Sequence, residues 1–414
     1  MSFFTKSVQE LETADIQFLI DNEVRETVQL EFKKTMSFNN NSKRMLCRHV
    51  SALANSQGGY LIIGITEDDG VAKEIIGIPK MFGVTKTEEW IEQVLISNIA
   101  QRVAPLIMKV IDIETDPDNM VLVIYVPLSP RAPHMVTFHG ENRYYVRHNT
   151  LTARAEEFEI RDIFVRSENM YNRTMRYLEA LNYVDPESPT FGENRWTRNL
   201  ELIFVNGMTR GFHHANSFYT FLCLPLVLSG NIIETTNAQL LQWLDRNERR
   251  YPPRQNDIFL PGLYSTTFEG LVLPEHTEGR NIARYLLINR NGHIEYGSTG
   301  GIIMEGPTTS FSINRIRDEY EMFLRFVCDL FDHQSVHYSG SIRIIFNVIR
   351  LNNLVPFEWK KSGLGLIGPF YPSPNIQLLE EATVFELSER IRTIVSYAHL
   401  RLSNAFGFKS PPQS

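Results

Sequence analysis

The sequence lacks an apolar run of the about 18 residues that a membrane-spanning helix needs. The nearest candidate, 218–228, is short and contains Pro225, so we expect a buried core segment there. The N-terminus has no basic stretch followed by an apolar core, and we expect a cytoplasmic protein that is not bound to a membrane. Cysteines are few: Cys47, Cys223 and Cys328 lack metal-ligand spacing, which predicts reduced, mostly buried thiols.

An excess of positive charge is also missing. The formal net charge is −7, and residues 1–165 hold 17 Lys+Arg against 23 Asp+Glu. Proteins that clamp nucleic acid with their whole surface are usually basic, so any such binding here must use a local patch. No Gly-Lys-Ser/Thr follows a glycine after a four-residue gap, so ATP binding through a P-loop is not supported.

The length of 414 residues predicts two domains, because a single core rarely grows that large. Alternating strand-like and helix-like patterns predict an α+β fold in both. We place the first domain at 1–165, a helical linker at 166–185, and a separate α+β domain of unknown role, a sensor or an oligomerisation module, at 186–414.

Local patterns predict individual elements. Alternation of Val28, Leu30 and Phe32 with polar residues predicts a half-buried strand, with Glu31 and Lys33 on the opposite face. Ser42 is a candidate N-cap for a helix over 43–55 that Gly58-Gly59 ends. Asn291-Gly292 between two apolar runs predicts a hairpin. Further helices are expected at 8–22, 85–100, 155–181, 311–331 and 375–402.

Four motifs then occur in order over about residues 20–160. They are Glu26 with Glu31-Phe32-Lys33; Ser51–Ser56 leading to Gly58–Gly64; the acidic turn Glu67-Asp68-Asp69-Gly70 followed by Ile76-Gly77; and Pro127, Ser129 and Pro133 before Tyr144–Arg147 and Thr150. This ordered set resembles the AlbA-type domain of the Schlafen family, long labelled a divergent AAA or ATP-binding domain. We recognise no family after residue 170.

The resemblance implies a small mixed sheet flanked by helices, and a carboxylate triad that binds a divalent cation and cleaves tRNA or ribosomal RNA. Carried over, the Mg²⁺ or Mn²⁺ ligands are Glu26, Glu31 and either Glu67 or Asp68, with Lys33 near the phosphate. An endoribonuclease acting on tRNA-like RNA, serving as a bacterial antiviral defence effector, is the first hypothesis. The resemblance also favours a homodimer, because one AlbA-type unit presents a half-groove.

The residues by themselves leave other readings open. In one unbroken strand Glu26 and Glu31 point to opposite faces, so a turn or bulge near Glu26 is needed before both can reach one ion. Acidic strand faces and turns are most often simply solvated. The second hypothesis is therefore a non-catalytic module that binds nucleic acid or nucleotide, and the third is a C-terminal sensor whose helix near 378–402 contacts a partner.

Basic residues for phosphate contact are found in two segments. Lys43, Arg44 and Arg48 lie at helical spacing, and Arg131, Arg143 and Arg147 surround the later strands. If RNA binds, we expect these six side chains to contact it.

Overall fold

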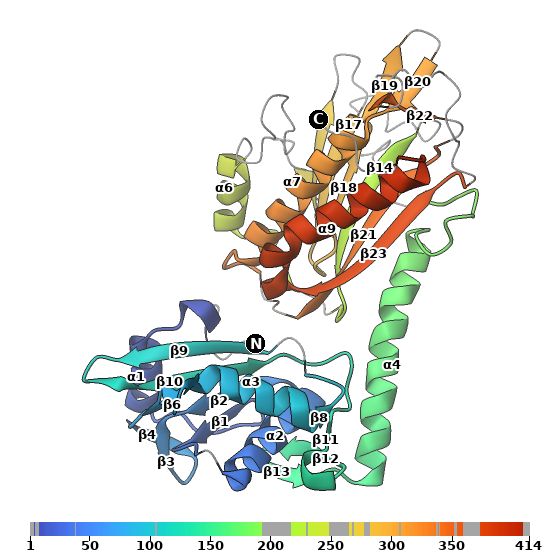
Figure 1. Cartoon of the computed structure of the whole chain (residues 1–414). Helices are drawn as coiled ribbons and strands as arrows, with labels where there is room; N and C mark the ends of the chain where they lie inside the picture. Colours follow the sequence, from blue (N-terminus) through green and yellow to red (C-terminus); the bar gives the residue numbers. More distant parts are fainter. Residues whose placement is uncertain are drawn as a thin grey trace. The chain divides into compact units, whose positions relative to one another are not determined.

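The computed structural model describes residues 4, 8–37, 39–103, 106–192, 217–228, 231–247, 265–266, 269–276, 282–305, 308–336, 338, 340–351, 354–358 and 373–408. The chain divides into an N-terminal unit, Met1–Tyr171, and a C-terminal unit, Asn172–Ser414 (Figure 1). Both combine helices with mixed or antiparallel sheets, which confirms the α+β class.

The N-terminal unit is built on a mixed sheet. Its strand order is β1-β2-β10-β5, with β9 also paired to β10; β1 and β2 are parallel and the other pairs antiparallel. A smaller sheet has the order β13-β12-β11-β8. The helices are η1 (Val8–Glu10), α1 (Thr13–Asp21), α2 (Asn40–Asn55), α3 (Thr87–Asn98) and η2 (Phe138–Gly140), and α4 (Glu157–Ala180) begins in this unit and continues into the C-terminal one. The strands are β1 (Leu30–Lys33), β2 (Gly59–Ile63), β3 (Ile65–Asp68), β4 (Val71–Ile75), β5 (Ile78–Pro79), β6 (Met81–Phe82), β7 (Thr85–Lys86), β8 (Ile99–Ala100), β9 (Ile107–Ile113), β10 (Asp116–Val126), β11 (Met135–Val136), β12 (Arg143–His148) and β13 (Leu151–Arg154).

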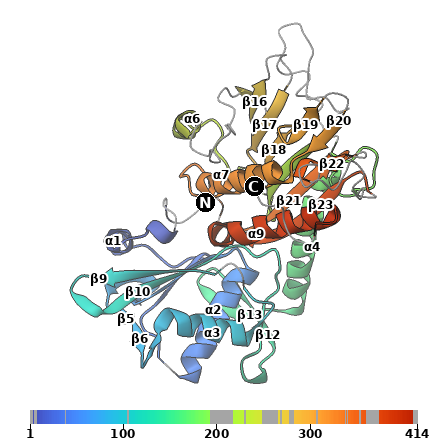
Figure 2. The same ribbon diagram turned by 45° about the horizontal axis from the view of Figure 1, so that its top comes forward.

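Two apolar layers cover the larger sheet. On one face α2 and α3 pack against Leu61, Ile63 and β10, as Figure 2 shows. On the other face α1 packs against Leu30, Phe32 and Ile62. Leu30 and Phe32 are therefore core residues, and Glu31 and Lys33 lie on the α2 side, as the alternation predicts.

The C-terminal unit is built on an antiparallel sheet with the order β15-β16-β17-β18-β14-β21-β23. Its strands are β14 (Phe218–Pro225), β15 (Ser265–Thr266), β16 (Gly270–His276), β17 (Ile282–Asn289), β18 (Ile294–Ser298), β21 (Ser341–Ile349) and β23 (Ile376–Thr383), with β19 (Ile302–Glu305), β20 (Thr308–Phe311) and β22 (Val355–Pro356) in a separate sheet. The helices α6 (Ala238–Asn247), α7 (Ile313–Phe331) and α9 (Val384–Ala405) join one continuous apolar core with this sheet.

Several local predictions are confirmed here and one is wrong in part. The hairpin at Asn291-Gly292 joins β17 to β18, and the segment containing Pro225 is the fully buried strand β14. The helix expected over 375–402 begins only at Val384, because Ile376–Thr383 pairs with β21 as a strand. All three cysteines are buried. Among the described residues, no helix is long and apolar enough to cross a membrane.

Candidate nucleic-acid interface

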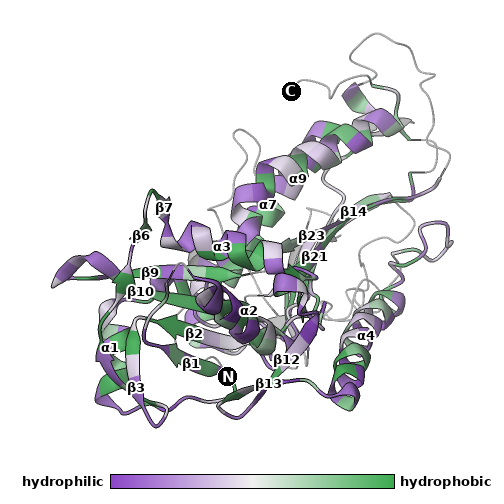
Figure 3. Cartoon of the chain, turned by 60° about the horizontal axis from the view of Figure 1, so that its bottom comes forward, coloured by the Kyte–Doolittle hydropathy of each residue, from purple (hydrophilic) through white to green (hydrophobic). Residues whose placement is uncertain are grey.

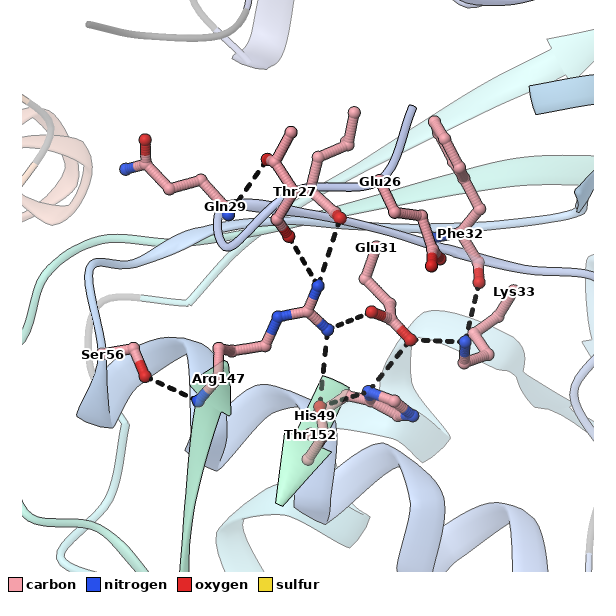
Figure 4. Close-up of polar contacts among 11 residues, drawn as sticks. Glu26, Thr27, Gln29, Glu31, Phe32, Lys33, His49, Ser56, Arg147 and Thr152 are labelled. Carbon is pink, nitrogen blue, oxygen red and sulfur yellow. Dashed lines mark hydrogen bonds and ion pairs between the residues drawn. The ribbon is translucent and has the colours of Figure 1, made fainter. Parts of the chain in front are cut away.

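The side chain of Glu31 is almost completely buried, although it lies on the polar face of β1. Its carboxylate is paired with the Arg147 guanidinium and the Lys33 ammonium group, and His49 Nδ1 lies 3.3 Å from Oε1 (Figure 4). Burial raises the pKa of Glu31, but His49, Lys33 and Arg147 together outweigh it and hold the pKa below its ordinary value. The carboxylate is therefore ionised and neutralised by the protein's own cations.

Arg147 is the centre of this cluster. Its side chain is fully buried, and its guanidinium donates to Glu31, to Thr27 O at 2.6 Å and to Leu30 O at 3.3 Å. Its backbone amide donates to Ser56 Oγ at 2.8 Å. Through these bonds β12 is tied to β1 and to the end of α2.

Glu26 lies beside this cluster because the chain turns before β1. Paired backbone bonds between Thr27 and Leu30 close the turn, and Glu26 Oε1 accepts the Phe32 amide at 2.8 Å. Burial raises the pKa of Glu26 above its ordinary value, and the negative charge of Glu31 adds to the rise. The turn required to bring Glu26 near Glu31 is present.

The acidic turn supplies no third ligand to Glu31. Glu67 Oε2 accepts the Gly70 amide at 2.7 Å, and the Glu26 carboxylate also lies against Gly70. Asp68 is exposed at the end of β3. Within the described residues, no group of three or more His, Cys, Asp or Glu side chains is arranged to hold a metal ion.

The arrangement thus does not fit the expected Mg²⁺ or Mn²⁺. A divalent ion needs carboxylate oxygens that are free to coordinate it, whereas Glu31 already contacts two side-chain cations. We therefore derive no step through such an ion.

A basic face lies next to this cluster; we define it as Lys33, Lys43, Arg44, Arg48 and Arg143. Arg44 Nε is 2.8 Å from Glu141 Oε2, and Arg143 Nη1 is 3.9 Å from Glu141 Oε1. The Arg48 guanidinium stacks over Tyr145 at 4.7 Å, and Lys43 lies 6.0 Å from the Trp90 ring. The contacts of Arg44, Arg48 and Arg143 connect α2 with β12, and that of Lys43 connects α2 with α3.

Two carboxylates next to the basic face are covered, while two of its cations, Arg44 and Arg143, are exposed. The side chains of Glu31 and Glu141 are only 4% and 5% exposed, whereas those of Arg44 and Arg143 are about half exposed. The surface that solvent meets is consequently positive, although the unit as a whole is acidic.

Family comparison identifies this unit. Residues 26–156 match the family model described as Schlafen, AlbA_2. The N-terminal unit is a Schlafen AlbA_2 domain. The resemblance predicted from the four ordered motifs is therefore confirmed, and the match ends before the C-terminal unit begins.

Comparison with solved structures finds two partial likenesses to the chain. The DIP2311 protein from Corynebacterium diphtheriae is 18% identical with a TM-score of 0.26; the match covers 36% of this chain and 27% of that one. The N-terminal domain of a putative protein from Nitrosomonas europaea, described as related to the ATP-dependent DNA helicase RecG, is 20% identical with a TM-score of 0.23. That match covers 33% of this chain and 86% of the other. No curated protein matches the chain.

The structure brings some of the predicted site residues of the AlbA_2 domain together and separates others. Glu26, Glu31 and Lys33 come together; Glu67 adjoins Gly70, and Asp68 faces solvent. Lys43, Arg44, Arg48 and Arg143 share the basic face, and Arg131 is exposed next to Ala132. Arg147 is inside the domain and contacts no solvent.

Two contributions to the cluster were not anticipated from sequence. His49 and Thr152 both contact it. Arg147 Nη1 donates to Thr152 Oγ1 at 3.4 Å, and the same Thr152 oxygen lies 3.2 Å from His49 Nδ1. Asn55, the last residue of α2, is also buried beside the cluster's strands. Its buried amide donates to His134 O and Tyr145 O and accepts the His134 amide.

Proposed function

We propose that the AlbA_2 domain binds nucleic acid through the basic face, with structured RNA as the preferred ligand. The observation that carries this proposal is the unequal exposure of charges: Arg44 and Arg143 are half exposed, and their partner Glu141 is covered. Phosphate contacts from Arg and Lys supply affinity without sequence choice. Our preference for RNA, and for tRNA within it, follows from the family alone.

Tyr145 supports the role of the basic face by fixing its geometry. Its hydroxyl donates to Glu141, and its ring stacks under Arg48. Arg48 and Arg44 are therefore held at defined positions one helical turn apart on α2. Less side-chain entropy is lost on binding when cations are held in place beforehand.

The metal-dependent endoribonuclease remains the second candidate, using Glu26, Glu31, Lys33 and Glu67 or Asp68. It is favoured by the raised pKa of Glu26, because burial and a neighbouring carboxylate are common at active sites. Against it stands the pairing of Glu31 with Arg147 and Lys33, so we rank nucleic-acid binding without cleavage first.

Fluorescence anisotropy with labelled tRNA tests the binding proposal. We expect Arg44→Glu and Arg48→Glu each to weaken binding about tenfold, and each lost phosphate contact to reduce the slope of log K against log salt by about one. Lys109→Glu is the matched control, because Lys109 lies on β9, separated from β1 by β2 and β10. Equal losses in the control, or no binding at low salt, would contradict the proposal.

A further inference from the structure

The hairpin formed by β6 and β7 carries an apolar side chain at its tip. Phe82 pairs with Thr85, so Gly83 and Val84 form a two-residue turn, and the hairpin projects next to α3 (Figure 3). Such turns usually consist of glycine and small polar residues. Gly83 fits this rule with a φ of +65°, whereas Val84 does not fit it and is 96% exposed. Met81 on β6 is also half exposed, so local folding does not account for the apolar tip.

The base of the hairpin is held by hydrogen bonds and by an aromatic contact. The Thr87 amide donates to Lys80 O at 2.9 Å, and Thr87 Oγ1 donates to Pro79 O at 2.6 Å. The Phe82 ring meets the Trp90 ring of α3 edge to face, with 5.3 Å between the ring centroids. The tip is therefore presented by an anchored base, which reduces the entropy lost when it contacts a ligand.

Trp90 connects the hairpin to the basic face. The Trp90 side chain is buried, and Lys43 Nζ lies 6.0 Å from the centroid of its ring. Arg44 follows Lys43 on α2 and is half exposed. One buried aromatic ring thus lies between the hairpin and the first cation of the basic face on α2.

The charge of the hairpin suits a polyanion. Residues 78–87 contain Lys80 and Lys86 and no acidic residue. Lys80 Nζ is 2.9 Å from Asp112 Oδ1, while the largely exposed Lys86 is 4.0 Å from Glu88 Oε1. Ion pairs at an exposed surface are weak, so the ammonium group of Lys86 remains available to a phosphate.

We propose that the tip of this hairpin packs against unpaired bases of an RNA whose phosphates lie on the basic face. The inference rests on the proposed function and adds Val84 and Met81 as base contacts. Apolar side chains insert between bases in other nucleic-acid complexes. Single-stranded loops and ends expose base faces, whereas a continuous duplex stacks them. The preferred ligand is therefore an RNA stem that carries an unpaired loop.

Fluorescence anisotropy of the full chain with two labelled RNAs tests this proposal. One RNA is a stem with an unpaired loop, and the other is a continuous duplex with the same number of phosphates. We expect Val84→Ser to weaken binding of the stem-loop about fivefold, because partial burial of one valine is lost. Binding of the duplex should not change. The slope of log K against log salt should also stay the same, since no phosphate contact is removed.

Phe18→Ser is the matched control, because Phe18 is an exposed apolar residue on α1, which covers the opposite face of the larger sheet. It should leave both affinities unchanged, and thermal unfolding checks that each variant keeps its fold. Serine suits a two-residue turn, so Val84→Ser is expected to fold normally.

Two results would overturn the inference alone. They are stem-loop binding that Val84→Ser leaves unchanged, and equal losses on the stem-loop and the duplex, in each case with Arg44→Glu still weakening both. The tip would then serve another partner, such as a protein. Absence of binding to either RNA at low salt would overturn the proposed function together with the inference.

Discussion

Arg147 and Glu31 form a charge pair that is almost entirely removed from solvent, on strands 116 residues apart in sequence. A buried pair is not in itself a source of stability, because desolvation offsets much of the attraction. Losing one partner is costly, however, since the other charge stays buried. Arg147 therefore acts as an internal counter-ion and not as a surface cation.

Replacing Arg147 tests this role. We expect Arg147→Met to destabilise the domain by about 3–5 kcal/mol, because the buried Glu31 loses one of its cationic partners and Thr27 O loses a donor. Arg143→Met, an exposed position on the same strand, should cost within about 0.5 kcal/mol. Urea denaturation measures both, and equal losses would contradict the buried-pair account.

His49 makes the stability of the cluster depend on pH. Burial lowers the pKa of His49 from 6.5 to about 4. Because the folded-state pKa is depressed, the fold favours the neutral ring. This contribution is complete above about pH 6.5 and is lost as the pH falls toward 4.

The difference in unfolding free energy between the wild type and His49→Gln should therefore shrink by on the order of 3 kcal/mol from about pH 7 to about pH 4. His148→Gln is the control, because the His148 side chain is half exposed. Urea midpoints at several pH values provide the measurement. A difference that stays constant with pH would show that His49 is not held neutral.

At the scale of single residues, the sequence predicts only part of the cluster around Glu31. The alternation in β1 places Glu31 and Lys33 on one face, and the structure confirms it. Nothing in the local pattern indicates that Arg147 returns to Glu31, because only the fold brings β12 beside β1. Arg147 was consequently predicted to contact phosphate, whereas its guanidinium is inside the domain.

Among the elements, α2 and the turn that follows it position the cluster. Asn39 caps α2, and its side chain accepts the Ser42 amide, so the expected N-cap at Ser42 is wrong by three residues. Both residues are good caps, and local chemistry alone does not choose between them. In the C-terminal unit, the capping box formed by Thr383 and Glu386 marks the start of α9. The helix predicted over 375–402 began too early because the apolar residues before Thr383 were assigned to the helix.

Gly58 makes the turn from α2 to β2 possible. Its φ is +72°, and a Cβ there would lie 2.6 Å from Leu128 N and from Val126 O. The position therefore requires both the left-handed conformation and the absence of a side chain, which agrees with the close-packing role expected of Gly58-Gly59.

A pair of alanine substitutions separates these two requirements. Gly83 has a similar φ of +65°, with no atom within 4 Å of an added Cβ. Gly83→Ala should cost about 1–2 kcal/mol from conformation alone. Gly58→Ala should cost clearly more, because backbone must also move. Thermal unfolding compares them, and similar costs would contradict the close approach at Gly58.

Considered as a whole, the molecule joins a Schlafen AlbA_2 domain to a C-terminal unit that the family match does not reach. The residue patterns predict the α+β class, which the structure confirms, and the charge count argues against a generally basic surface. The patch that we propose for nucleic acid lies where Glu141 is covered and its partners Arg44 and Arg143 are exposed. Which charged side chains are covered and which are exposed depends on the fold, so this patch cannot be predicted from the charge count.

We propose that Arg147 and Lys33 neutralise Glu31, so that the domain binds RNA without cleaving it. Incubating the full chain with tRNA and Mn²⁺, with and without a chelator, and resolving the products on a denaturing gel tests this most directly. We predict intact tRNA under every condition, together with a binding signal that Arg44→Glu weakens. Chelator-sensitive cleavage that disappears in Glu31→Gln but persists in Lys109→Glu would contradict the claim.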